Sequence, residues 1–439
     1  MKSSGSKLYR WTTNNMDVNR SKAILNFAFW ISAGLIGLAA VVYAKLIAFF
    51  QGIFFEQFTK YPALVSGIGP LLFVIATWLV KKFGPDAKGS GIPQVLTAIE
   101  QSAHHKDQDQ FSWNSPLVSI RTAVVKIISS CVGILGGASI GREGPTVQIA
   151  AAGFTWIGSK IRRFAPNLDF QTFLVAGSAA GVAAAFNTPI AGIAFAVEEL
   201  GGGALGVVRQ FVMLAIIVSG VIAQGIGGNY LYFGHPSFVN VDFSLLLAEA
   251  VGIGIVGGLF GGLFAKILAE PVITKLPNHW LRRAFAAGTI CAAIGYFTKG
   301  ATAGSGYEVT SNILNSGSIE EASVFFPILK LATTILSYLS GMAGGIFSPS
   351  LSIGAGIGLS VAKIIALANF RACALLGMVA FFSGAVRAPL TAVIIVMEMT
   401  DEHVLALPFM IAAYIAFSAG KRIMKEPLYH YLARKHMEG

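Results

Sequence analysis

Three short motifs rich in glycine and proline interrupt the apolar segments of this chain, and each returns about 200 residues later. Both residue types break helices, because proline lacks a backbone donor and glycine weakens the helix. A duplicated membrane fold with helices broken at matching places is typical of transport proteins whose site lies near the bilayer midplane. The pairs are Gly89–Pro93 with Gly304–Gly306, Gly141–Pro145 with Gly345–Pro349, and Asn187–Ala191 with Arg387–Thr391, at offsets of 215, 204 and 200 residues. The pattern predicts a transporter or a channel.

Composition places most of the chain in a bilayer. It is 54% hydrophobic and 12% charged, whereas soluble domains carry about 25% charged residues. The apolar stretches are 23–55, 61–80, 116–139, 172–197, 208–231, 243–269, 324–342 and 403–420, and several exceed the ~20 residues that cross a bilayer. We therefore predict an all-α polytopic membrane protein in which strongly tilted helices are mixed with half-helices.

The sequence divides into four parts. They are a basic N-terminal segment (1–22), a first transmembrane repeat (23–230), a turn-rich connector (231–241) and a second repeat with a short C-terminus (242–439). The net charge of +11 is concentrated at both ends, and the positive-inside rule then predicts cytoplasmic termini. No soluble domain is left to bind nucleic acid. The short chain without a cleavable signal core indicates a bacterial plasma membrane.

The three cysteines, Cys131, Cys291 and Cys373, lie far apart in apolar segments. Their spacing fits no metal site. We expect reduced, buried thiols, no metal and no cofactor. The hydrophilic stretch 101–115 is interpreted as a solvated loop.

Glu143 begins an apolar run and is followed by Gly144 and Pro145. Pro is favoured in the first helical turn, so Glu143 is expected at a helix N-terminus. Two interpretations stay open. The carboxylate either competes with a free anion for the N-terminal site and acts as a gate, or it caps the helix beside Arg142.

Glu198 and Glu199 end another apolar run. One of them either relays protons or both face water, and for their counterpart Glu398 the surface interpretation is stronger. Lys126, in apolar surroundings, is expected to pair with an acid near Arg142.

Two hydroxyls suggest anion ligands, each with a plainer alternative. Ser90 lies between glycines at a helix start and is either a halide ligand or an ordinary cap. Tyr429 lies near the last helix and is either a ligand or an interfacial anchor.

These motifs together resemble the CLC family of chloride channels and chloride/proton antiporters. Gly-Ser-Gly-Ile-Pro at 89–93, Gly-Arg-Glu-Gly-Pro at 141–145 and Gly-Ile-Phe-Ser-Pro at 345–349 match its filter signatures, in order. The stretches 186–189 and 386–391 add two further matches, so the similarity covers about 25–435. The resemblance implies a homodimer whose subunits each hold an inverted repeat of broken, tilted helices and their own pathway.

The resemblance also implies roles for single residues. A central anion would be bound by the hydroxyls of Ser90 and Tyr429. The backbone N–H groups of Ile346 and Phe347 would complete that site. N–H groups around Glu143, between Arg142 and Gly144, would hold an outer anion. Glu143 would be the external gating glutamate and Glu199, beside Glu198, the internal proton-transfer glutamate.

Subtype features of the resemblance indicate chloride/proton exchange. Nitrate-preferring relatives carry Pro where this chain has Ser90, fluoride exporters depart from the motif, and channels typically lack an acid at Glu199. Gln94, where an acid is common, departs from the pattern. A passive gated chloride channel is the alternative.

An intramembrane serine hydrolase at Ser305 is disfavoured, because no histidine lies in an apolar helix core. If Glu143 competes with the anion, turnover should rise as pH falls.

Overall fold

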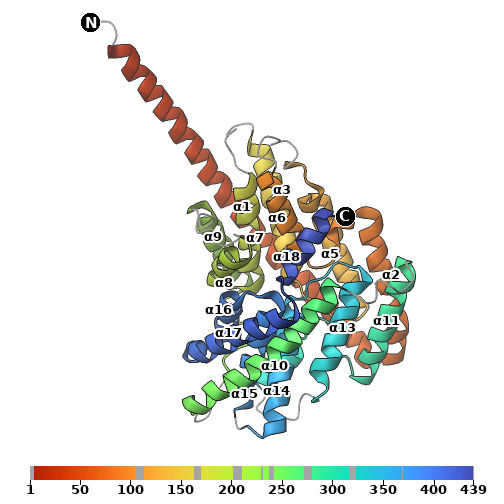
Figure 1. The fold of residues 1–439 in the computed structure, drawn as a ribbon. Coiled ribbons are helices and arrows are strands. Elements are labelled where there is room, and N and C mark those ends of the chain that lie inside the picture. The colour runs from red at the N-terminus through yellow and green to blue at the C-terminus, as the bar shows by residue number, and fades with distance from the viewer. Residues whose placement is uncertain are drawn as a thin grey trace.

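A computed structural model describes residues 4–104, 113–162, 170–200, 210–228, 231–236, 242–270, 279–315, 323–367 and 369–438. Within these ranges the chain is helical, with only isolated β-bridges, as the composition predicts. The first half contains α1 (Ser4–Lys60), α2 (Pro62–Phe83), η1 (Pro85–Ala87), α3 (Ile92–His104), η2 (Pro116–Val118), α5 (Ile120–Leu135), α6 (Glu143–Ile161), α7 (Phe170–Phe186), α8 (Pro189–Phe195), the π-turn η4 (Ala196–Leu200) and α9 (Gln210–Gly227) (Figure 1).

The second half repeats this pattern. It contains α10 (Phe243–Ala269), α11 (Trp280–Phe297), α12 (Tyr307–Asn315), α13 (Phe326–Ser340), α14 (Phe347–Ile365), α15 (Phe370–Val386), α16 (Pro389–Thr400), η8 (His403–Leu405), α17 (Ala406–Ile423) and α18 (Leu428–Glu438). The helices α6 and α14 are both 19 residues long, and α7 and α15 are both 17 residues long. The duplication seen in the motifs therefore extends to the helices that follow them.

Reciprocal contacts relate the two halves by a pseudo-two-fold axis. The N–H of Gly89 donates to the carbonyl of Met342 at 2.9 Å, and the N–H of Gly304 donates to the carbonyl of Ala138 at 3.0 Å. Each residue of one bond is the repeat counterpart of a residue in the other, which is the signature of a two-fold contact. The fold is an inverted repeat of tilted and broken helices.

The expected half-helices are present. Asn187 (φ 60°) and Arg387 (φ 71°) occupy equivalent positions, and both adopt the left-handed conformation that ends a helix. The prolines two residues later, Pro189 and Pro389, then start α8 and α16. At 7 and 12 residues these helices are too short to cross a bilayer.

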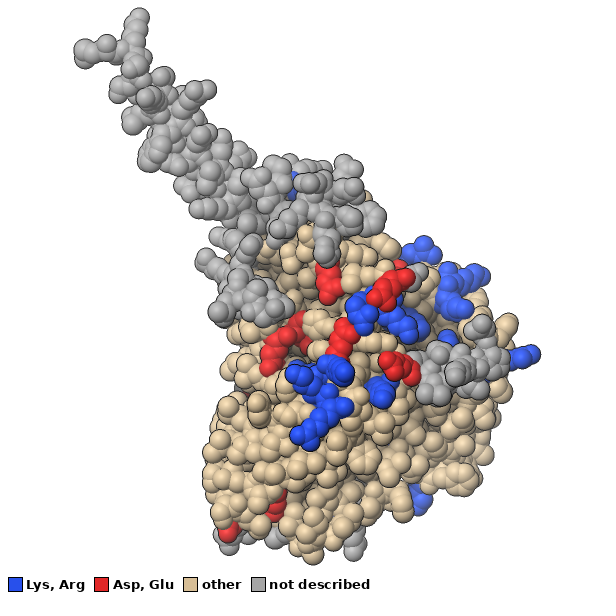
Figure 2. All heavy atoms as spheres, in the orientation of Figure 1, with Lys and Arg blue, Asp and Glu red and all other residues tan. Residues whose placement is uncertain are grey.

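Five helical segments are long and apolar enough to span a membrane, so this is an integral membrane protein. Among them, α10 has 27 residues and a length of about 40 Å at 1.5 Å per residue, longer than a straight crossing needs. Large apolar side chains cover the outside, including Trp30, Leu64, Leu71 and Val221. Figure 2 shows Lys and Arg gathered on the part of the visible face that carries α18, and few charges below it.

The three cysteines are free and buried, as predicted. Most of the expected solvated loop, 105–112, lies outside the described residues, as do 237–241 of the connector. The described part of the connector is not fully exposed, because Tyr232 and Phe233 are buried. The N–H of Phe233 donates to the carbonyl of Met399 at 3.0 Å, which holds the connector against α16.

Candidate ion-binding site

Backbone hydrogen bonds join the broken-helix loops of the two repeats at one place. The N–H of Gly141 donates to the carbonyl of Gly345 at 2.7 Å, and the N–H of Gly345 donates back at 2.8 Å. The N–H of Gly344 donates to the carbonyl of Gly89 at 3.1 Å. The first turns of α6 and α14 are thereby brought side by side, with the loop before α3 against them. Their unpaired N–H groups and dipoles make this junction attractive to anions.

Glu143 is the first residue of α6, as predicted, and its side chain is only 1% exposed. Its Oε2 accepts a hydrogen bond from the N–H of Ser348 at 3.4 Å, in the first turn of α14. Its Oε1 lies 3.9 Å from Nε of Arg142. The carboxylate therefore bridges to the helix of the other repeat, where the capping interpretation expected only its own helix. It occupies a position where a free anion would also be stabilised.

Ser90 and Tyr429 meet at this junction from distant parts of the chain. Both side chains are buried, and neither hydroxyl has a hydrogen-bond partner among the described residues. The Tyr429 phenol lies within electrostatic reach of Ser90 and Glu143. A Cβ at Gly144 would overlap the Ser90 hydroxyl and would displace it. Buried hydroxyls are normally paired, so these two are candidates for binding a ligand.

Ile346 and Phe347 provide the first N–H groups of α14, with Ile346 as the N-cap residue. Such groups have no acceptor within their own helix. The Phe347 ring packs against Phe186 and Phe382, at centroid distances of 4.7 and 4.1 Å. Aromatic packing therefore fixes the start of α14 and leaves its backbone as the polar surface.

The Glu198 carboxylate is bound to the other repeat and does not simply face water. Its oxygens accept hydrogen bonds from the N–H groups of Leu390 (2.8 Å) and Thr391 (2.6 Å), and from the Thr391 hydroxyl (2.7 Å). It caps α16, the half-helix of the other repeat.

Glu398 makes the reciprocal contact. Its Oε2 accepts from the N–H of Ala191 at 3.0 Å, at the start of α8. The surface interpretation of Glu398 is therefore wrong. Glu198 and Glu398 are equivalent residues of the two repeats, and each caps the half-helix of the other repeat.

Glu199 points elsewhere. It lies in the π-turn η4 and is 2% exposed, and its Oε1 has no hydrogen-bond partner among the described residues. Nε2 of His430 lies 4.0 Å from this oxygen. Sequence analysis did not identify His430 as a candidate. Its position directly after Tyr429 could have indicated that it lies near the site.

Buried lysines hold the glycine loops. Lys126 donates to the carbonyl of Gly89 at 2.8 Å, so the predicted pairing with an acid near Arg142 is wrong. Lys330, which sequence reasoning missed, donates to the carbonyls of Thr302 (2.9 Å) and Gly304 (2.8 Å). The two lysines are 204 residues apart, the same offset as the two filter motifs. That offset was the signal that could have identified Lys330.

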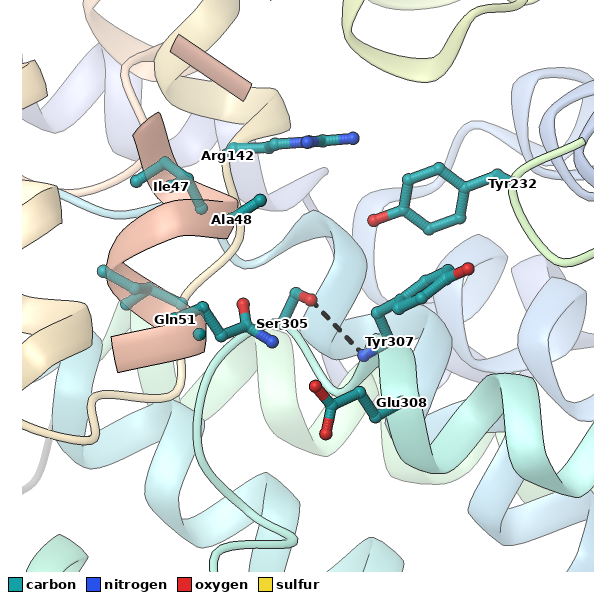
Figure 3. A pocket seen from close by; sticks show the side chains of 10 residues that line it. Ile47, Ala48, Gln51, Arg142, Tyr232, Ser305, Tyr307 and Glu308 are labelled. Carbon is teal, nitrogen blue, oxygen red and sulfur yellow. Dashed lines mark hydrogen bonds between the residues drawn. The ribbon is translucent and has the colours of Figure 1, made fainter. Parts of the chain in front are cut away.

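Two pockets lined by basic side chains lie near the junction of the broken-helix loops. One, of about 350 Å³, is lined by residues including Arg142, Tyr232, Ser305 and Glu308. In Figure 3 the Arg142 side chain extends toward Tyr232, whose ring centre lies 5.6 Å from the guanidinium carbon. The other, of about 380 Å³, lies beside the loop before α3 and is lined by basic residues that include Lys88, Arg283 and Lys435. Both pockets present cations near the loops, which favours the approach of anions.

Comparisons with known proteins agree with this geometry. The family model described as voltage gated chloride channel matches residues 72–421. The chain therefore belongs to the voltage-gated chloride channel (CLC) family, whose members are ion channels and transporters and not enzymes.

Three solved structures share the fold. A slow cyanobacterial Cl⁻/H⁺ antiporter has a TM-score of 0.80 at 23% identity, with 94% of this chain and 97% of that chain covered. A CLC-type fluoride/proton antiporter has a TM-score of 0.72 at 22% identity, with 91% and 96% covered. A eukaryotic CLC transporter has a TM-score of 0.74 at 19% identity, with 94% and 75% covered.

Proposed function

We propose that this protein exchanges chloride for protons, and that Glu143 serves both as the gate and as the proton acceptor. The carrying observation is the Glu143 carboxylate at the first turn of α14, hydrogen-bonded to Ser348. A carboxylate in that position competes with chloride for the same N–H groups. Protonation removes its charge and releases the position, so each departure of the side chain moves a proton and admits an anion.

The central anion is held, in this proposal, by two hydroxyls and two backbone groups. Ser90 and Tyr429 donate their unpaired O–H groups, and Ile346 and Phe347 donate N–H groups. An outer anion binds the N–H groups near Gly144 when Glu143 leaves. Arg142 supports this position with its charge, 3.9 Å from the Glu143 carboxylate. Hydroxyl and N–H groups are neutral, so burying them costs much less free energy than burying charged side chains. Neutral donors of this kind suit a monovalent halide. No cofactor is proposed.

Glu199 is the proposed internal proton-transfer acid. It is buried beside Tyr429 and lies within electrostatic reach of its phenol. A buried ionisable group in a membrane protein usually has a function, and Oε1 of Glu199 has no hydrogen-bond partner among the described residues. Glu198 supports it indirectly, because capping α16 fixes the turn that carries Glu199. A gated passive chloride channel remains the second candidate. Under that function Glu143 would gate without moving protons.

The proposed setting is a homodimer in a bacterial plasma membrane with both termini in the cytoplasm. Basic residues gather on the part of the molecule that carries α18 (Figure 2), in agreement with the positive-inside rule.

The half-helices α8 and α16 and the adjoining α9 and α17 expose large apolar side chains. These are Ile190, Leu390, Ile217, Val221, Leu407, Met410 and Tyr414. Chemical crosslinking of the purified protein in lipid vesicles should give dimers.

The test is a transport measurement on the purified protein in liposomes. A chloride gradient is imposed, and proton movement is recorded first with the voltage free and then with it clamped. Exchange predicts uphill proton movement that survives the clamp. Chloride flux without coupled protons would establish the channel alternative instead. In electrical recordings, a channel would keep the chloride equilibrium potential when a pH gradient is added, and an exchanger would not.

A further inference from the structure

The buried Glu199 carboxylate needs a route for protons, and one side chain reaches it from solvent. His430 lies in the first turn of α18, and its side chain is 30% exposed. Its Nε2 is 4.0 Å from Oε1 of Glu199, an oxygen that has no hydrogen-bond partner among the described residues. The imidazole therefore touches water on one side and faces a buried acid on the other. A separation of 4.0 Å closes by a small side-chain rotation or by one bridging water.

The start of α18 separates two tasks. Tyr429 is fully buried at the anion junction, and the next residue, His430, turns away from it toward Glu199. Consecutive helical residues point about 100° apart, which explains how neighbours in sequence serve different positions. One helical turn thus brings an anion ligand and a titratable group together at the junction.

The His430 imidazole lies within electrostatic reach of two carboxylates. Its acidic neighbours are Glu100 on α3 and Glu426, which precedes α18, in addition to the backbone of Glu199. Glu426 is itself paired with Arg434, at 2.8 Å. Although α10 and α15 also pack against α18, no charged side chain of theirs in the described ranges is among the electrostatic neighbours of His430. An imidazole can both accept and release a proton, which suits transfer between water and a carboxylate.

We propose that His430 is the residue that passes protons between solution and Glu199. The imidazolium gives the proton on Nε2 to Oε1 of Glu199, so an N–H bond breaks and an O–H bond forms. The neutral ring keeps its other proton on Nδ1, and rotation of the side chain turns the vacant Nε2 to the exposed side, where it takes a proton from a hydronium ion and releases water. The reverse sequence runs when the exchanger turns in the other direction. This inference rests on the proposed exchange and adds a residue to it.

The test compares His430→Gln and His430→Ala with the unchanged protein in liposomes. Chloride-driven proton flux is measured in each, together with chloride flux and the midpoint of thermal unfolding in detergent. A positioned proton-transfer group contributes roughly 10²–10⁴-fold to a rate. We expect both variants to lose at least about tenfold of the proton flux relative to the chloride flux. Imidazole added to the buffer should restore proton flux in His430→Ala, because the vacated position is open to solvent.

The matched control is His436→Gln, in the same helix and 42% exposed, which should leave coupling unchanged. Proton flux equal to that of the unchanged protein in His430→Gln would overturn the proposal. So would a loss in both variants that imidazole does not restore and that accompanies a lowered unfolding midpoint, because His430 would then be structural. If the unchanged protein itself moves no protons, the exchange proposal fails on that measurement alone, before any variant is compared.

Discussion

The two repeats share a scaffold and differ in a few side chains, and those differences concentrate at the candidate site. Glu143 and Phe347 are equivalent residues, each the first of a 19-residue helix. Glu143 places a carboxylate at the junction, whereas the ring of Phe347 packs against Phe186 and Phe382 and only its backbone N–H group faces the junction. Glu199 likewise corresponds to Met399, which is fully buried. At these two pairs of positions the first repeat has an acid and the second an apolar side chain.

Where the repeats agree, the shared residues hold the fold. Glu198 and Glu398 cap each other's half-helices, and Lys126 and Lys330 hold the carbonyls of equivalent loops. Charged residues inside a membrane protein are usually read as functional. Here the pseudo-symmetry separates the two kinds: a charge with a matching charge in the other repeat is structural, and a charge without one is a candidate for transport.

The largest effect is expected at the gate. Glu143→Gln keeps the size of the side chain but cannot ionise or exchange a proton. We expect chloride flux to persist, coupled proton flux to vanish, and the rise of chloride flux toward low pH to disappear, because no carboxylate is left to protonate. Flux assays in liposomes between acid and neutral pH test this. Coupled proton flux surviving in the variant would remove Glu143 from the mechanism.

The second comparison concerns Glu199 and its counterpart. Glu199→Gln should abolish proton coupling while sparing chloride flux. The matched change Met399→Leu keeps an apolar side chain of similar volume and should cost less than about 1.5 kcal/mol of stability, with coupling unchanged. The same liposome assay applies to both. Equal coupling in the two variants would show that the asymmetry at this position has no function.

The third comparison tests the lysines. Lys330→Met leaves the carbonyls of Ala303 and Gly304 without their side-chain donor and should cost about 3 kcal/mol, at about 1–3 kcal/mol per buried unpaired group. Lys126→Met should cost less, because the carbonyl of Gly89 still accepts from the N–H of Gly344 at 3.1 Å. Thermal unfolding in detergent measures both. A Lys126 variant less stable than the Lys330 variant would contradict this account.

The smallest effect is expected at the caps. Glu198→Ala removes the acceptor for three hydrogen bonds and should destabilise the protein by about 1–2 kcal/mol, the usual range for lost caps. Glu398→Ala should destabilise it somewhat less. Both variants should keep full proton coupling, measured in liposomes beside the unfolding midpoint. Uncoupling in Glu198→Ala with an unchanged midpoint would return Glu198 to the proton route.

Motif spacing was sufficient to predict the duplication, the half-helices and the helix start at Glu143. Each depends on local rules: glycine and proline break helices, and proline starts them. The surface position of Glu398 and the acid partner of Lys126 were predicted wrongly, because the start of α8 and the Gly89 loop are brought to these side chains only by tertiary packing. The participation of Tyr232 and His430 was not predicted, since neither belongs to a recurring motif.

The sequence by itself determined that this protein is helical, membrane-embedded and built from two related halves with breaks at matching places. Hydrophobicity and helix propensity act over short stretches and can be read from them. Only the tertiary structure decided which buried charges are caps, which lysines hold carbonyls, and which acids have a buried oxygen that accepts no hydrogen bond from the described residues. Those assignments depend on contacts between residues that are 26 or 37 positions apart for the lysines and 193 or 207 apart for the caps, where hydrogen-bond energies are set by distances that no local pattern contains.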